Sequence, residues 1–366
     1  MIERGFMIRT TILWLAAALL LGGCIGAKSG TRTGSRSPDG QFRDRHMKNV
    51  TRLTSDGDNG EAYFSGDGKK LIFQSSRGGQ ACDKIWTMNI DGEDKRMVSP
   101  DHGAHTCSFF LPDSRIVFSS TSHIPGGCPP KPQSPPGVRY VWPLYPYDIF
   151  IADADGSNAR RLTDNPKYDA EPVVSPDGRQ IVFGSQREGD FDIYVMNADG
   201  SNVRRLTDRV GYDGGPWFSP DGTKIVWRAW YPESSAERQQ WKDCMDKDYI
   251  IAVPLDIWIM DNDGSNKRLL VKNGATNFAP SWHPDGRRII FVSNRDDWRE
   301  DIRQFGHNFE LYLIDLDGRG LERITYNTTF DSFPMFSPGG KKLVWASNRD
   351  PDKPRQTDIF IADWEE

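Results

Sequence analysis

The sequence has few residues of the kinds that most catalytic and metal centres use. It contains 6 histidines and 5 cysteines in 366 residues, and no two cysteines have C-x-x-C spacing. It also has no G-x-S-x-G nucleophile elbow, no H-E-x-x-H zinc motif and no phosphate-binding glycine-rich loop. These absences argue against a serine hydrolase, a zinc site and a P-loop enzyme, so we expect no metal and no cofactor.

An excess of positive charge is also lacking. The formal net charge is −5, and lysine and arginine are spread along the chain rather than gathered in a stripe. Nucleic-acid binding depends on basic side chains that neutralise phosphates. A polynucleotide partner is therefore not expected.

The apolar run near the N-terminus, Ile12–Leu21, is too short to cross a bilayer. Arginines precede it, and Leu-Gly-Gly-Cys ends it at Cys24, so residues 1–24 are predicted to be a signal peptide that starts at Met1 or Met7. The Leu-Gly-Gly-Cys ending resembles the bacterial lipobox, which implies a lipid on Cys24. The alternative is ordinary cleavage, in which Cys24 has no special role.

The other four cysteines would lie in an oxidising compartment after export, where disulfides are the default state. Four cysteines allow three pairings, and their spacing does not choose among them. A zinc site is disfavoured because no histidine is regularly spaced from a cysteine. The disulfide candidates are Cys82, Cys107, Cys128 and Cys244.

The main signal is an internal repeat. Each copy has a tight-turn motif, an alternating apolar strand, a second apolar run, an Asp-Gly turn and a strand ending in Arg-Leu-Thr or a relative. Four strands in a unit of roughly forty residues are typical of a propeller blade. The six turn motifs begin at Ser65, Leu111, Ser175, Ser219, His283 and Ser337.

The last repeat ends after its third strand, Asp358–Asp363, while the outer strand's sequence occurs ahead of the first repeat, at Met47–Thr54. This arrangement predicts an all-β, six-bladed propeller of four-stranded blades over residues 47–366, closed by the N-terminal strand. Closure of this kind hydrogen-bonds the strand edges that an open array would expose. Residues 25–46 are rich in Ser, Gly, Thr and Arg and are predicted to be a flexible tether.

The Ser-Pro-Asp-Gly, Tyr-Val-Met-Asn-Ala-Asp-Gly-Ser-Asn and Arg-Arg-Leu-Thr phrases resemble the repeats of the TolB C-terminal propeller family. The resemblance covers residues 47–366 and implies the propeller fold. TolB carries an additional N-terminal α/β domain, in whose place this chain has a short tether, so the resemblance does not imply the same role. The repeat specifies a fold better than it specifies a function.

Three repeats carry insertions between their second and third strands: Ser122–Tyr147, Ala229–Leu255 and Asn294–Asn308. They occupy the same slot in the repeat, so they should project from the face of the ring on which the inner strands begin. Their aromatic residues either form a binding surface or fold over the blades as a small core of their own. These residues include Trp142, Tyr145, Trp230 and Trp241.

One position, six residues before each turn motif, is polar in every repeat and is predicted to lie near the mouth of the central channel. Its residues either bind a ligand or cap their strands through local hydrogen bonds. The residues are Asn59, His105, Asp169, Asp213, Asn277 and Asp331.

A second position, at the end of the second strand, holds arginine in four repeats. Arginine there could hold an anionic ligand, or bridge to an Asp of the first position and tie neighbouring blades together. The residues are Arg77, Arg187, Arg295 and Arg349.

The sequence thus favours a non-enzymatic, monomeric binding scaffold of the bacterial cell envelope, held to a membrane by its N-terminal lipid. Its partner would be an envelope protein, a peptide or a glycan at the face that carries the long loops of blades 2, 4 and 5. An Asp directly after the lipidated cysteine would favour retention at the inner membrane. This chain has Ile25 at that position, which points to the outer membrane, with the protein facing the periplasm. The alternative is a hydrolase or lyase that acts on a polysaccharide at the channel mouth.

Overall fold

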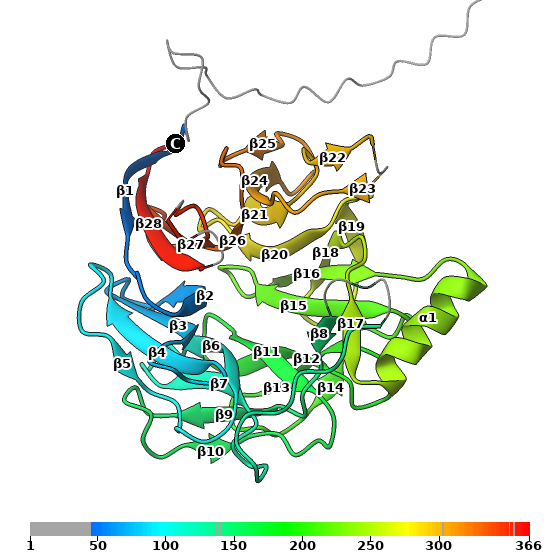
Figure 1. The fold of residues 1–366 in the computed structure, drawn as a ribbon, viewed down its shortest axis with the longest axis horizontal. Helices are drawn as coiled ribbons and strands as arrows, with labels where there is room; N and C mark the ends of the chain where they lie inside the picture. Colours follow the sequence, from blue (N-terminus) through cyan, green and yellow to red (C-terminus); the bar gives the residue numbers. More distant parts are fainter. Residues whose placement is uncertain (1–44, 136–137, 139–140, 302–303, 351, 354–355) are drawn as a thin grey trace, which may run out of the picture. The chain divides into compact units, whose positions relative to one another are not determined.

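A computed structural model shows six blades arranged in sequence order around a central axis (Figure 1). The predicted fold class, with four-stranded blades closed by the N-terminal strand, is confirmed. The described residues are 45–366 with the exception of 136–137, 139–140, 302–303, 351 and 354–355. The predicted signal peptide, Cys24 and nearly all of the predicted tether therefore lie outside the described residues.

In each of the first three blades, four antiparallel strands follow one another from the axis outward. Blade 1 consists of β2 (Asp58–Phe64), β3 (Lys70–Ser76), β4 (Lys84–Asn89) and β5 (Arg96–Met97). Blade 2 consists of β6 (His105–Phe110), β7 (Ile116–Ser120), β9 (Asp148–Ala152) and β10 (Arg160–Arg161). Blade 3 consists of β11 (Asp169–Val174), β12 (Gln180–Ser185), β13 (Asp192–Asn197) and β14 (Arg204–Arg205).

The other three blades repeat this order, and the last takes its outer strand from the N-terminal end of the described chain. Blade 4 consists of β15 (Tyr212–Phe218), β16 (Lys224–Trp230), β18 (Asp256–Asp261) and β19 (Arg268–Val271). Blade 5 consists of β20 (Asn277–Trp282), β21 (Arg288–Ser293), β24 (Glu310–Asp315) and β25 (Glu322–Arg323). Blade 6 consists of β26 (Asp331–Phe336), β27 (Lys342–Ser347), β28 (Asp358–Trp364) and β1 (Met47–Arg52).

The insertions add the remaining elements. In blade 2 the insertion contains β8 (Val141–Pro143), and in blade 4 it contains helix α1 (Ser235–Asp246) and β17 (Tyr249–Ile251). The insertion of blade 5 forms a hairpin of β22 (Trp298–Arg299) and β23 (Gln304–Phe305). Among the described residues, no helix is long and apolar enough to cross a membrane.

The repeated turn motif ends each inner strand through side-chain hydrogen bonds. In blade 3 the Asp177 carboxylate accepts hydrogen bonds from the Ser175 hydroxyl, at 2.6 Å, and from the backbone N–H of Arg179, at 3.1 Å. Gly178 has a φ of +72°, a conformation that glycine adopts without steric cost. The motif therefore fixes where the second strand begins, and with it the register of the blade.

The core lies between the blades, because alternate side chains of a strand point to opposite sides of its sheet. In blade 1, Phe73 packs with blade 6 residues such as Val344, while Ile72 packs on the other side with Phe118 of blade 2. All four side chains are fully buried. Burying each one contributes roughly 1.5–3 kcal/mol, so the blades stabilise one another.

The Arg-Leu-Thr phrase holds a buried carboxylate at the start of the third strand. In blade 3, Arg205 and Thr207 donate to Asp192 at 2.6 and 3.2 Å, and the Thr207 hydroxyl accepts the N–H of Ile193 at 2.9 Å. Equivalent contacts hold Asp148, Glu310 and Asp358. The phrase recurs because a buried carboxylate needs partners.

A disulfide joins Cys82, in the loop after β3 of blade 1, to Cys128, in the insertion of blade 2. The expectation of a disulfide is confirmed for these two cysteines. Cys107 and Cys244 are instead free, buried thiols, so the expectation is wrong for them. The reason is their placement: Cys107 lies on the inner strand β6, and Cys244 lies on helix α1.

Candidate functional site

The residues of the first predicted polar ring lie at the start of the inner strands. Their side chains are buried inside the blades, and none of them lines the central cavity. The Asn59 amide donates to the carbonyl of Asp56 at 3.0 Å, and the Asp169 carboxylate accepts from Asn165 at 2.8 Å. The ring is Asn59, His105, Asp169, Asp213, Asn277 and Asp331, each no more than 2% exposed.

The four arginines of the second predicted ring contact the first ring within their own blade. Arg187 donates to Asp169 at 2.6 Å, because an antiparallel pair places the end of β12 beside the start of β11. The expectation that these arginines tie neighbouring blades together is therefore wrong. The other pairs are Arg77 with Asn59, Arg295 with Asn277 and Arg349 with Asp331, at 3.0, 3.2 and 2.9 Å.

Blades 2 and 4 depart from this pairing. The imidazole Nε2 of His105 lies 3.0 Å from the carbonyl of His102, and burial lowers the pKa of His105 to about 4. Asp213 accepts from the Trp227 indole at 2.6 Å and from the Tyr231 hydroxyl at 2.7 Å. Because these partners carry no positive charge, burial raises the pKa of Asp213 to about 7.

The insertions of blades 2 and 4 pack against each other beside blade 3. Strand β8 pairs with β17, so that Trp142 lies opposite Ile250. On α1, the Trp241 indole donates to Asp190 of blade 3 at 2.6 Å. We call these packed residues the insertion cluster; its buried members are Ala104, Val141, Leu144, Tyr147, Tyr168, Ala170, Phe191, Tyr212, Trp241, Cys244, Met245 and Tyr249.

The loop aromatics thus form a core of their own, one of the two alternatives that the sequence allows. Trp241 is buried, while Trp142, Tyr145 and Trp230 are half-buried against the cluster. Trp142 also lines the central cavity, so the insertion cluster extends to the channel. The blade 5 hairpin is separate, and its Trp298 is 46% exposed.

Every inner strand contains a β-bulge two residues after the first ring. At each bulge one residue has a positive φ, between 45° and 60°, a conformation that is uncommon outside glycine. All six of these residues line one cavity. We call them the channel ring: Glu61, Cys107, Glu171, Gly215, Ala279 and Phe333.

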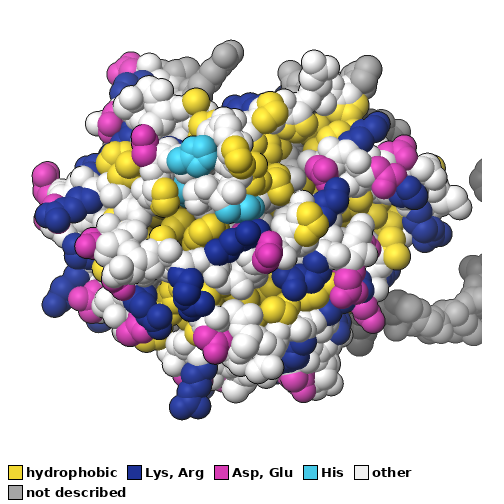
Figure 2. All heavy atoms as spheres, turned by 90° about the horizontal axis from the view of Figure 1, so that it is seen from below, with side chains coloured by type: hydrophobic (Ala, Val, Ile, Leu, Met, Phe, Trp, Pro, Cys, Tyr) yellow, Lys and Arg dark blue, Asp and Glu magenta, His cyan; other side chains and the backbone are white. Residues whose placement is uncertain are grey.

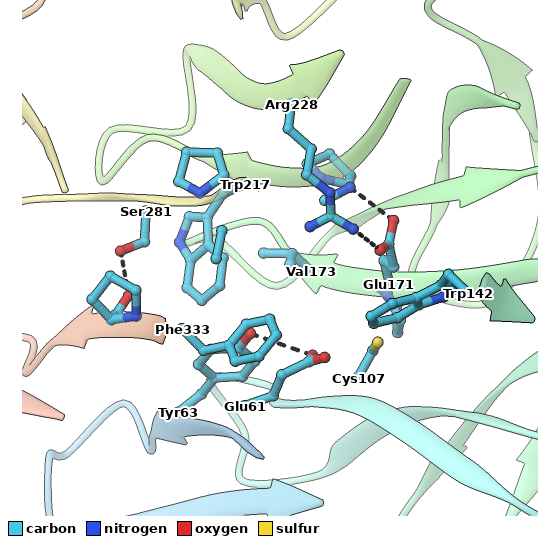
Figure 3. Close-up of a pocket in the computed structure, with 16 residues that line it drawn as sticks. Glu61, Tyr63, Cys107, Trp142, Glu171, Val173, Trp217, Arg228, Ser281 and Phe333 are labelled. Atoms are coloured by element: carbon cyan, nitrogen blue, oxygen red, sulfur yellow. Dashed lines mark hydrogen bonds and ion pairs between the residues drawn. The ribbon is translucent and has the colours of Figure 1, made fainter. Parts of the chain in front are cut away.

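The cavity lies on the axis of the ring, because each blade contributes one channel-ring residue to its wall. Its volume is about 40 Å³, which is room for about three water molecules. Blades 1 to 3 contribute Glu, Cys and Glu to the channel ring, whereas blades 4 to 6 contribute Gly, Ala and Phe. The cavity therefore has a polar half and an apolar half (Figure 3).

An ion pair occupies part of the polar half. The Arg228 guanidinium, on β16, binds the Glu171 carboxylate and also donates to the Tyr212 hydroxyl at 2.9 Å (Figure 3). Glu171 accepts a further hydrogen bond from the N–H of Gly215 at 2.7 Å. A Cβ at Gly215 would lie 2.4 Å from the Arg228 Nη1, so glycine leaves the room that the arginine fills.

Glu61 lies in the same half without a cation of its own. Its hydrogen-bond partners are neutral groups: the Tyr63 hydroxyl donates to it at 3.4 Å, and the Cys107 thiol hydrogen-bonds to it. Glu61 is 6% exposed. Burial, followed by repulsion from Glu171, raises the pKa of Glu61 to about 7.

The apolar half continues outward as a group of phenylalanines in ring contact at the starts of β20, β24 and β26. Phe278 stacks at 6.2 Å on Phe330, and both contact Phe309 edge-on; Phe333, in the channel ring, contacts Phe278 at 5.8 Å. All four are half-buried. We call Phe278, Phe309, Phe330 and Phe333 the phenylalanine cluster.

Away from the cavity, the surface mixes both signs of charge. Figure 2 shows lysine and arginine interspersed with aspartate and glutamate on one side of the molecule, with apolar patches between them. This view contains no broad area of a single sign. The distribution agrees with the absence of a basic stripe in the sequence.

The residues around the cavity do not suit a metal ion. Within the part of the chain that the structure describes, no three His, Cys, Asp or Glu side chains gather as a ligand set. In the cavity itself, Arg228 already neutralises Glu171, which removes one carboxylate as a metal ligand. His123 pairs with Asp148 at 3.1 Å, away from the cavity lining.

Glu61, Glu171 and Arg228, which are charged and line the cavity, were not among the site residues predicted from the sequence. A carboxylate two residues after the first ring, inside an inner strand, was the available signal for Glu61 and Glu171. An arginine inside the apolar second strand of blade 4 was the signal for Arg228. The bulge that aims position 61 at the axis has no separate sequence mark.

The fold and the cavity together define a six-bladed propeller with a polar and apolar channel site. The sequence profile described as the TolB beta propeller domain matches residues 144–240. The uncharacterized protein Atu1656 of Agrobacterium fabrum is 33% identical over 137 residues, 37% of this chain and 41% of that protein. The Tol-Pal system protein TolB of Francisella tularensis is 32% identical over 107 residues, 29% of this chain and 22% of that protein.

Solved structures show the same architecture. TolB from Acinetobacter baumannii superposes with a TM-score of 0.55 at 16% identity, over 82% of this chain and 65% of that one. An oligogalacturonate lyase in complex with manganese superposes with a TM-score of 0.50 at 12% identity, over 87% and 93%. At such identities the likeness concerns the fold alone. The predicted resemblance to TolB-like propellers is confirmed, and this chain spans less than half the length of the curated relatives it matches.

Proposed function

We propose that this protein is a non-enzymatic binding scaffold of the cell envelope, and that it receives a protein or peptide at the face where the inner strands begin. We call this the insertion face, because the insertions of blades 2, 4 and 5 arise there. On this proposal a segment of the partner covers the phenylalanine cluster and reaches into the cavity.

The observation that carries the proposal is a contrast between two matched pairs of residues. Phe191 and Tyr212, which precede β13 and begin β15, are 1% and 5% exposed under the insertion cluster. Phe309 and Phe330 form the corresponding pair in blades 5 and 6, and both are half-buried. The chain covers one aromatic pair with its own insertion and leaves its counterpart accessible. Aromatic side chains next to a cavity are common anchor sites for partner proteins.

The envelope location is supported by the relatives and by the N-terminal sequence. One group of relatives is named for the Tol-Pal system, and Leu21–Cys24 resembles a lipobox. We propose that a lipid on Cys24 anchors the protein in the outer membrane, facing the periplasm. The Cys24→Ala variant should then leave the membrane fraction, and membrane retention of this variant would contradict the lipid anchor.

Site-specific photocrosslinking in the native bacterium tests the binding face. A photoreactive phenylalanine analogue is placed at Phe330, in the phenylalanine cluster, or at the exposed Lys341, in the turn before β27 on the opposite face of the same blade. The proposal predicts one defined adduct with an envelope protein or peptide from position 330 and none from position 341.

The chemical nature of the crosslinked partner also decides between a polypeptide and a glycan as the ligand. A polypeptide adduct that depends on position 330 supports the proposal. An adduct from position 341 alone would place the partner on the wrong face, and a glycan adduct would replace the protein partner with a sugar one.

The alternative, a hydrolase or lyase acting on a polysaccharide, is favoured by one observation. A buried carboxyl group whose pKa lies near 7, such as Glu61, suits a general acid or base. Against it, Arg228 neutralises the second carboxylate, and the cavity of about 40 Å³ is much smaller than a sugar-chain site. Turnover of oligosaccharides by the wild type but not by Glu61→Gln would establish the enzyme.

A further inference from the structure

The charges in the cavity's polar half do not balance when Glu61 is ionised. The two carboxylates, Glu61 and Glu171, face one guanidinium, Arg228, so the half carries one excess negative charge. When Glu61 is protonated, the charges balance. Burial makes an uncompensated charge costly. This half of the cavity therefore favours either a proton on Glu61 or a bound cation beside it.

Arg228 cannot supply that cation, because its position is fixed. It binds Glu171 and the Tyr212 hydroxyl, and it is surrounded by close-fitting glycines. A Cβ at Gly214 would lie 2.2 Å from the Tyr212 hydroxyl, and one at Gly215 would lie 2.4 Å from Arg228. These contacts hold the arginine on Glu171. The charge of Arg228 lowers the pKa of Glu61 by less than burial and Glu171 raise it, so Glu61 has no ion-pair partner of its own.

Aromatic rings surround the cavity close to Glu61. Tyr63, Trp142, Trp217 and Phe333 all line it, and Figure 3 shows Phe333 and Tyr63 beside Glu61. The ring faces of tryptophan, tyrosine and phenylalanine attract cations. A carboxylate among aromatic rings favours a compact cation over an anion or a purely apolar group.

We propose that the polar half of the cavity binds a primary ammonium group, which forms an ion pair with Glu61. The small volume fits an ammonium head on an alkyl stem, and a lysine side chain has this shape. The inference rests on the proposed function, since a lysine of the partner is the natural source. A free amine offers the same chemistry and is the second source.

Binding at this site should depend on pH, because the ammonium group pairs with ionised Glu61. The pKa of Glu61, at about 7, means that the ionised fraction rises about tenfold between pH 6 and pH 8. Burial raises the pKa values of Tyr63 and Cys107 well above their ordinary values, so both stay neutral in this range. The titratable and charged groups that interact with Glu61 are Tyr63, Cys107, Tyr147, Glu171 and Arg228.

The test measures the affinity of the full chain for n-butylammonium by calorimetry at pH 6 and pH 8, with n-butanol as the uncharged control. The wild type should bind n-butylammonium about tenfold more tightly at pH 8 than at pH 6, and should bind n-butanol more weakly and with no pH dependence. Equal affinity for the two compounds, or affinity for the amine that does not change with pH, would overturn the inference. These comparisons use the wild type and need no variant.

The variant Glu61→Gln keeps the shape of the side chain and removes its charge. It should lose at least tenfold in affinity for n-butylammonium at pH 8 and should lose the pH dependence. The exposed Glu93→Gln is the matched control and should behave as the wild type. Unchanged binding to Glu61→Gln, with a native near-ultraviolet spectrum, would contradict the ion pair.

Two capped tripeptides, Gly-Lys-Gly and Gly-norleucine-Gly, separate the two sources of the ammonium group. A protein partner is indicated if the chain binds the lysine peptide more tightly than the norleucine peptide, and at least as tightly as it binds n-butylammonium. Binding of n-butylammonium but not of the lysine peptide overturns the lysine source and leaves a free amine. Failure of the crosslink from Phe330 together with retained amine binding would refute the proposed function but not this site.

Discussion

The Arg228 guanidinium on β16 binds the Glu171 carboxylate on β11, 57 residues earlier in the chain, across the boundary between blades 4 and 3. This ion pair decides the chemistry of the channel. It neutralises Glu171, and it leaves Glu61 as the carboxylate whose charge a partner can satisfy. The two glutamates belong to the same ring of bulge residues, and their environments differ because only one has the arginine.

Loss of Arg228 should destabilise the fold. The variant Arg228→Met leaves Glu171 buried without its cation, and breaking a buried pair in this way costs about 3 kcal/mol. Urea unfolding at pH 7.5 measures the difference in the free energy of unfolding. The control is Arg179→Met, whose side chain is 85% exposed. A variant at 228 as stable as that control would show that the pair contributes nothing to stability.

The glycine beside the arginine gives a second, smaller perturbation. In Gly215→Ala the new methyl group would overlap the Arg228 Nη1, and the backbone φ of +57° disfavours alanine. We expect a loss of at least about 1 kcal/mol. Gly339→Ala is the matched control, since its Cβ would lie 4.0 Å from the nearest atom. Equal melting temperatures for the two variants would argue against the close fit around Arg228.

Glu61 should make the fold less stable as the pH rises. Its pKa in the folded state, about 7, lies above its ordinary value of 4.5, so the folded state holds a proton that the unfolded state releases. The wild type therefore loses stability between about pH 4.5 and pH 7 relative to Glu61→Gln, by an amount on the order of 2 kcal/mol. Urea unfolding of both proteins at pH 5 and pH 8 measures it. A difference that stays constant with pH would mean that Glu61 titrates normally.

The disulfide should stabilise the attachment of the blade 2 insertion. Cys82 and Cys128 are 46 residues apart in sequence, and closing a loop of this length contributes about 4 kcal/mol. Cys82→Ser with Cys128→Ser should unfold at lower urea. Peptide mapping of the wild type without reductant should recover Cys82 linked to Cys128. An alkylating reagent should label Cys107 and Cys244 only after the protein is unfolded. Rapid alkylation of either thiol in the native protein would contradict their burial.

The fold could be predicted because its signals are local and repeated. Turn motifs such as Ser175–Gly178 and the alternating strands after them recur in every blade, and the displaced strand at Met47–Thr54 reveals the ring closure. The disulfide could not be chosen from three pairings, since pairing depends on which loops the fold brings together. Only the structure places Cys128 beside Cys82.

The candidate site was harder to predict because a bulge changes the direction of a side chain. Simple alternation places positions 59 and 61 on the same side of β2, yet Asn59 is held inside its blade and Glu61 lines the cavity. The positive φ at position 61 accounts for the difference. The alternating apolar pattern therefore predicts the strand and the polar residue at its start, but it does not predict that Glu61 faces the channel.

The affinity of the partner captured from position 330 for two variants of the full chain tests the binding face most sharply. Trp142→Ala alters the cavity at the insertion face, and Lys341→Glu alters the opposite face. If the partner binds at the insertion face, the tryptophan variant should lose at least about tenfold in affinity, and the lysine variant should bind as the wild type does. Full affinity in the tryptophan variant, with a loss in the lysine variant, would contradict the assignment of the binding face.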